Sequence, residues 1–118
     1  MRLIEWVDRL WARMFVKRKW PPKQPSALTI FRADGNVLAV AHRWDMYRSP
    51  GKVDEYVAWF QTGLQADELP RMSTTGQIFD GEKLRAVIFI TVDWHPVFDF
   101  EDGRWLADVK LTMREVSK

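Results

Sequence analysis

An Asp-Gly pair occurs three times in this chain of 118 residues, each time between two apolar or alternating runs. The copies are Asp34-Gly35, Asp80-Gly81 and Asp102-Gly103. Glycine adopts positive φ without a Cβ clash and aspartate tolerates the left-handed region, so the pair is a strong signal for a β-hairpin. Three hairpins predict an antiparallel sheet of about five or six strands.

The runs beside these turns predict the strands 27–33, 37–44, 77–79, 84–94, 97–100 and 105–116. In the last run apolar and polar residues alternate from Trp105 onward, which is typical of a strand with one buried face. Residues 86–92 are nearly all apolar, which is typical of a strand covered on both faces. We therefore expect a covering layer on each side of the sheet, with Trp94 and Trp105 in the core.

Two segments have the spacing of a covering helix. Apolar side chains recur at helical intervals after Ser49-Pro50, at Val53, Tyr56, Val57, Phe60 and Leu64. The spacing of Leu3, Ile4, Val7, Leu10, Trp11, Met14 and Phe15 likewise predicts an N-terminal amphipathic helix, which ends before Pro21-Pro22. The expected fold class is α+β, with this helix at 1–20, a proline-rich link at 21–26 and a single α+β domain at 27–118.

Composition narrows the class of protein. Hydrophobic residues make up 47% of the chain, which suits a folded domain, and the length suits one domain. The absence of cysteine excludes disulfides, thiolate metal sites and thiol nucleophiles, and it fits the reducing cytoplasm, where we expect the protein to be located. Charged residues interrupt the N-terminal apolar run every few positions, so we expect no export signal and no transmembrane segment.

Charge is distributed unevenly along the chain. Residues 1–25 hold seven basic and two acidic groups, a net charge of +5, whereas the other 93 residues hold 11 basic and 14 acidic groups, a net of −3. The candidate basic patch consists of Arg13, Lys17, Arg18, Lys19 and Lys23. Such a patch could bind nucleic acid or the surface of an anionic membrane.

The N-terminal helix can pack on its own sheet or on a neighbouring chain, and for the second case its large aromatic residues, with one from the internal helix, are candidates for partner binding. They are Trp6, Trp11, Phe15, Trp20 and Trp59. Trp59 falls off the apolar stripe of the predicted internal helix, and exposed aromatics are enriched in protein interfaces. These residues predict contact with a protein partner or with further copies of the chain.

Catalytic and metal-binding patterns are weak. The only histidines are His42 and His95, and the best pair of metal ligands is Asp93 with His95, two positions apart on one side of a predicted strand. The sequence contains no nucleotide-binding glycine loop and no Gly-x-Ser-x-Gly motif. We therefore predict no catalytic residue and no cofactor.

Together these features favour a non-catalytic interaction or assembly protein, such as a structural subunit of a larger particle. It would bind a protein partner or its own copies through the N-terminal amphipathic helix and the exposed aromatics. Binding of nucleic acid or an anionic membrane surface through residues 17–19 is the first alternative. A small metal-dependent enzyme using Asp93 and His95 is the second.

Overall fold

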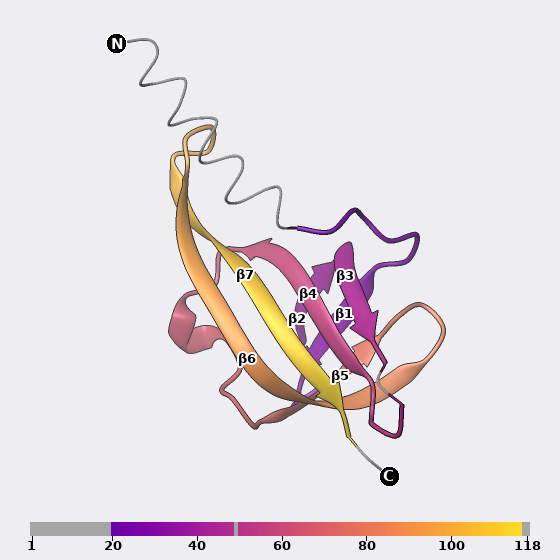
Figure 1. Ribbon diagram of the computed structural model, residues 1–118. Helices are drawn as coiled ribbons and strands as arrows, with labels where there is room; N and C mark the ends of the chain where they lie inside the picture. Colours follow the sequence, from indigo (N-terminus) through magenta and orange to yellow (C-terminus); the bar gives the residue numbers. More distant parts are fainter. Residues whose placement is uncertain (1–19, 49, 117–118) are drawn as a thin grey trace.

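The computed structural model describes residues 20–48 and 50–116, which form one antiparallel sheet of seven strands (Figure 1). The strands are β1 (Leu28–Arg32), β2 (Val37–Ala41), β3 (Arg43–Tyr47), β4 (Glu55–Thr62), β5 (Thr75–Phe79), β6 (Leu84–Asp99) and β7 (Arg104–Glu115). Their order across the sheet is β2-β1-β5-β6-β7-β4-β3. A three-residue 3₁₀ helix, η1 (Ala66–Glu68), lies in the connection from β4 to β5.

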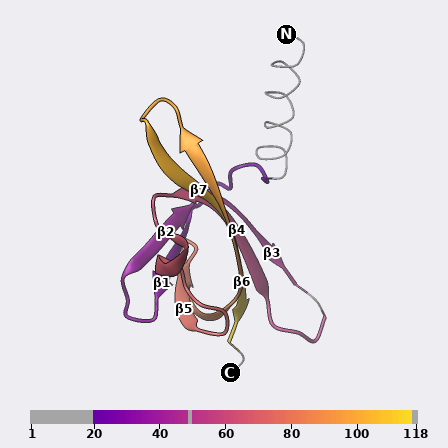
Figure 2. The same ribbon diagram turned by 90° about the vertical axis from the view of Figure 1, so that its left-hand side faces the viewer.

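One connection determines the shape of this sheet. The strands β2 and β3 lie at its two opposite edges, yet His42 alone joins them. In a flat sheet the two edges would be about 28 Å apart, since six strand spacings separate them, whereas three consecutive Cα atoms span at most about 7 Å. The sheet therefore rolls until its edges meet, with β1, β2 and β5 on one side and β3 and β4 on the other (Figure 2).

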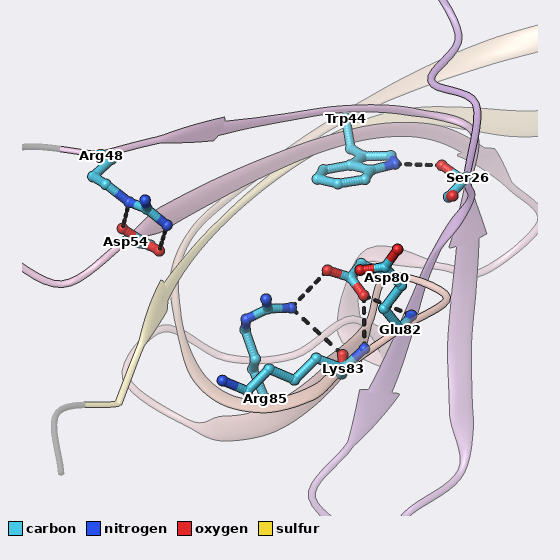
Figure 3. Close-up of polar contacts among 8 residues, drawn as sticks. All are labelled: Ser26, Trp44, Arg48, Asp54, Asp80, Glu82, Lys83 and Arg85. Atoms are coloured by element: carbon cyan, nitrogen blue, oxygen red, sulfur yellow. Dashed lines mark hydrogen bonds and ion pairs between the residues drawn. The ribbon is translucent and has the colours of Figure 1, made fainter.

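The segment before β1 closes the seam between the two edges. The backbone N–H of Gln24 donates to the carbonyl of His42 at 2.8 Å, and its side-chain amide donates to the carbonyl of Trp44 at 2.9 Å. In return, the indole N–H of Trp44 donates to the carbonyl of Ser26 at 2.8 Å (Figure 3). The carbonyls of His42 and Trp44, which an open sheet edge would leave unpaired, thus accept hydrogen bonds from the proline-rich link.

The core fills the inside of the roll. Side chains alternate along each strand, so one face of every strand points inward. Leu69, which follows η1, is also buried in this core, and the indole N–H of Trp94 in β6 donates to the carbonyl of Leu64 in the same β4–β5 connection at 3.3 Å. The buried cluster consists of Leu28, Ile30, Leu38, Ala41, Tyr56, Ala58, Phe60, Leu69, Ile78, Val87, Phe89, Ala107, Val109, Leu111 and Met113.

The three predicted hairpins are confirmed. Each Asp-Gly pair lies in a turn that joins two antiparallel neighbours, β1 with β2, β5 with β6, and β6 with β7. The turn glycines Gly35, Gly81 and Gly103 all have positive φ, between 64° and 98°. Local turn chemistry therefore predicted these pairings correctly.

The predicted α+β class is wrong, because the described residues form sheet almost throughout and their only helix is η1. The residues assigned to an internal helix form β4, which pairs with β7 from Glu55 to Thr62 and with β3 on its other side. Their spacing fits a strand equally well, since Tyr56, Ala58 and Phe60 all point into the core. Aromatic and β-branched side chains favour that outcome. The N-terminal amphipathic helix predicted for 1–20 lies outside the described residues, apart from Trp20.

The expectation that β6 is covered on both faces is also wrong. A register shift between Phe89 and Thr91 leaves Ile90 as an extra residue in the pairing with β7. Because such a bulge reverses the alternation, inward-facing side chains occur at Phe89 before it and at Val92 after it. The apolar run thus joins two inward-facing sets, while Leu84 at the start of the strand is 53% exposed.

Gly76 has a packing role that can be tested. A Cβ on Gly76 would lie 2.5 Å from the carbonyl oxygen of Phe31 and 2.5 Å from the ring of the buried Phe89. We expect Gly76→Ala to lower the free energy of unfolding by about 1–3 kcal/mol, as overpacked core substitutions do. Urea denaturation measures this. Gly63→Ala is the matched control, because its Cβ would meet only Leu106 at 4.0 Å; an equal loss in both variants would contradict the packing explanation.

Candidate interaction surfaces

The outer face of strands β2, β1, β5 and β6 carries a row of uncharged side chains. The register places Thr29 opposite Val40 on one side and opposite Phe79 on the other, and Phe79 lies opposite Leu84. Val40 is 50% exposed, Phe79 37% and Leu84 53%. An uncharged row with three exposed large apolar side chains therefore crosses four strands, and Thr29 lies between Val40 and Phe79.

A second row lies beside the first. Phe31 is opposite Val37 and Gln77, and Gln77 is opposite Ala86. We call the two rows together the apolar outer face: Thr29, Phe31, Val37, Val40, Gln77, Phe79, Leu84 and Ala86. None of these residues is charged. The residues on the solvent-facing side of a sheet are normally polar. An exposed patch of apolar side chains is instead typical of an interaction site.

The second surface is the end of the hairpin β6–β7, which projects beyond the other strands (Figures 1 and 2). The ring of Phe98 lies edge to face with Phe100 at 5.0 Å and with Trp105 at 5.2 Å. Phe100 is 88% exposed and Trp105 64%. The prediction that Trp105 belongs to the core is therefore wrong: β4 ends at Thr62, opposite Ala107, and nothing in β4 extends far enough to cover Trp105.

The end of this hairpin is acidic as well as aromatic. Residues 97–106 contain Asp99, Glu101 and Asp102 but only one basic residue, Arg104. The carboxylate of Asp99 accepts the backbone N–H groups of Glu101 at 3.0 Å and Asp102 at 3.3 Å, which fixes the turn. We call Phe98, Phe100 and Trp105 with these three carboxylates the acidic aromatic tip.

A polar cluster around Asp80 and Arg85 lies at the β5–β6 turn (Figure 3). The guanidinium of Arg85 bonds to the Asp80 carboxylate at 2.7 Å, and each side chain is 20% exposed. Arg85 also lies 6.0 Å from the centre of the Tyr56 ring. The Tyr56 hydroxyl is buried without a hydrogen-bond partner in the described part of the chain, and burial raises its pKa.

Hydrogen bonds hold the pKa of Asp80 at about 2, below its usual value of 3.8. The backbone N–H of Lys83 is the largest cause, and the N–H of Glu82 and the guanidinium of Arg85 add to it. These contacts stabilise the ionised carboxylate. We call these contacts of Asp80 the Asp80 clamp, because they hold the β5–β6 turn in its conformation. They are structural and do not indicate a catalytic site.

A cavity of about 470 Å³ lies outside the sheet, beside the loop from β3 to β4. Its lining includes Lys52, Glu55 and Arg114, and the last two form an ion pair at 2.9 Å. Small-molecule sites are mostly apolar with a few convergent polar groups. This lining is mainly charged and largely self-paired, so it is a poor ligand site.

The predicted partner-binding aromatics are only partly described. Trp20 and Trp59 are half-buried, and the ammonium of Lys110 lies 5.9 Å from the centre of the Trp59 ring. Trp6, Trp11 and Phe15 lie outside the described residues. The more exposed aromatics are Phe100 and Trp105, which were not among the predicted residues, although their place beside an Asp-Gly turn was a usable signal.

The structure also describes only part of the predicted basic patch, and it describes both weak metal candidates. In the basic patch, Lys23 is exposed, and Arg13, Lys17, Arg18 and Lys19 lie outside the described residues. The weak metal candidates Asp93 and His95 share the outer side of β6, where their partners in β7 are Lys110 and Asp108. Within 20–48 and 50–116, no group of three or more His, Cys, Asp or Glu side chains could hold a metal ion.

No protein family model, curated protein or solved structure matches this chain. No helix in the part of the chain that the structure describes is long and apolar enough to cross a membrane.

The Asp80 clamp predicts a specific dependence on pH. Because the pKa of Asp80 is lower in the folded protein, its carboxylate stabilises the fold above pH 4, and this contribution is lost as the pH falls toward 2. We expect Asp80→Asn to lower the free energy of unfolding by about 1–3 kcal/mol at pH 7 and by less at pH 2.5. Denaturation at the two pH values measures this. Asp34→Asn, in the equivalent turn of β1–β2, is the control, and a loss from Asp80→Asn that did not shrink in acid would contradict the clamp.

Proposed function

We propose that this protein is a non-catalytic interaction or assembly protein that binds a second copy of itself through the apolar outer face. One observation carries the proposal. Two adjacent rows of side chains cross four strands without a charge, and Val40, Phe79 and Leu84 remain substantially exposed there. The cores of protein interfaces are likewise depleted of charged residues and rich in apolar contact.

The lack of charge favours a second copy as the partner. In a two-fold symmetric interface the same patch lies on both sides, so a charge near its centre would face an identical charge. Like charges across an interface are costly, and the apolar outer face has none to oppose. Two such faces can pack about 10 Å apart with their side chains interleaved, as in other sheet-on-sheet contacts.

The expected affinity is modest. Each side chain that is about half exposed contributes roughly 1 kcal/mol when it is fully buried, since complete burial contributes about 1.5–3 kcal/mol. Association costs at least about 4 kcal/mol in lost translational and rotational freedom. The four such side chains of each copy, Val37, Val40, Phe79 and Leu84, contribute about 8 kcal/mol in all, which leaves at most about 4 kcal/mol and corresponds to a dissociation constant of about 1 mM. We therefore expect a weak dimer. Binding through the 17–19 basic cluster and metal-dependent catalysis remain predictions that no described residue supports further.

Analytical ultracentrifugation of the full chain tests this proposal. Between about 10 μM and 2 mM, a range that spans the expected dissociation constant, we expect the average mass to rise from the 14.0 kDa monomer toward twice that value. The double variant Val40→Lys and Leu84→Lys should weaken the dimer by more than about tenfold, because it buries unpaired charge in the interface. Both side chains are exposed in the monomer, so the fold should be retained.

The double variant Met72→Lys and Tyr47→Lys is the matched control. It adds the same charge at two exposed large side chains outside the apolar outer face. We expect it to dimerise like the unaltered protein. A monomer at about 2 mM, or equal dimerisation by the face variant and the unaltered protein, would contradict the proposal.

A further inference from the structure

We infer that the acidic aromatic tip binds the basic N-terminal stretch, residues 1–19, of the same chain. This inference does not depend on self-association through the apolar outer face, because the tip lies at the other end of β6 from Leu84 and Ala86. It concerns what covers the tip, and it follows from the tip's side chains, its charge and its position in the fold.

The side chains of the tip favour an apolar partner. Phe100 and Trp105 expose most of their surface, and Phe98 holds both rings edge to face. Their mutual contacts give the rings a defined arrangement before anything binds. Pre-arranged exposed aromatics are typical of the anchor residues that supply most of the binding energy in an interface.

The charge of the tip selects among partners. Residues 97–106 have a net charge of −2, which would repel nucleic acid and anionic membranes. Residues 1–19 hold six basic and two acidic groups, a net charge of +4, together with large apolar side chains such as Trp6, Trp11 and Phe15. That stretch therefore offers both properties that the tip would recognise, positive charge and apolar bulk.

The position of the tip places this stretch within reach. In both ribbon views the start of the described chain, in indigo, lies at the same end of the molecule as the β6–β7 turn (Figures 1 and 2). Nineteen residues can span up to about 60 Å when extended, so chain length does not limit the contact. Tethering gives such a contact an effective concentration in the millimolar range, which favours the chain's own stretch over that of a second copy at micromolar protein.

Site-directed cross-linking tests the contact in the full chain. The sequence has no cysteine, so any introduced pair is unique. We would combine Arg104→Cys, which keeps all three carboxylates of the tip, with Val7→Cys, Leu10→Cys or Met14→Cys and oxidise each protein at about 1 μM. For at least one pair we expect a disulfide within the monomer that forms at least tenfold faster than in the matched control, which replaces Arg104→Cys by Lys83→Cys at the exposed turn of β5–β6.

One further variant and one change of salt identify the source of any rate difference. Phe100→Ser should slow the fastest pair at least fivefold, and 1 M NaCl should slow it as well, since salt screens exposed charges. Rates that match the control for all three pairs would overturn the inference. So would a disulfide that appears only at the mass of two chains, which would assign the tip to a second copy. Because the readout at about 1 μM is intramolecular, failure of the sheet-face dimer would leave this result unaffected.

Discussion

The architecture depends on one short connection, the single residue His42 between the two edge strands of the sheet. Since the chain passes directly from one edge to the other, the sheet cannot lie flat. Rolling separates an inner face, which becomes the core, from an outer face, which receives no covering layer from the described residues. The bonds from Gln24 and Trp44 then close the seam that the roll leaves between its edges.

A tight roll limits what can fill its interior. Small residues such as Ala58, Ala107 and Gly76 lie on the inner face beside large ones such as Tyr56 and Phe89. This mixture lets a large ring pack against the bare backbone of the neighbouring strand, as the contact between Phe89 of β6 and Gly76 of β5 shows. The bulge at Ile90 keeps the long strand β6 in contact with this interior along both parts of its length.

The hairpins could be predicted because Asp-Gly turns depend on neighbouring residues alone. The identity of β4 could not, since its residues fit both a helical stripe and a strand, and pairing with β3 and β7 decides between them. The roll was equally hidden, because the run 37–44 looked like one strand and only the sheet order shows that His42 divides it.

The interaction surfaces were missed for related reasons. The run 86–92 was expected to be covered on both faces because it is nearly all apolar, yet Ala86 at its start lies on the outside of the roll within the apolar outer face. Trp105 keeps the phase of the inner face, but its strand continues past the end of β4. Both errors concern where neighbouring strands begin and end, which the pattern of a single segment does not contain.

Closure of the roll across the seam is the central claim, because the core and both surfaces follow from it. Residue-resolved amide hydrogen exchange by NMR tests it most directly at Gln24, whose N–H bonds to the carbonyl of His42 across the seam. We predict that this amide is protected by a factor comparable to that of amides in the central strands. Exchange of Gln24 at the rate of an unstructured peptide, while the central strands remain protected, would show an open seam and contradict the account.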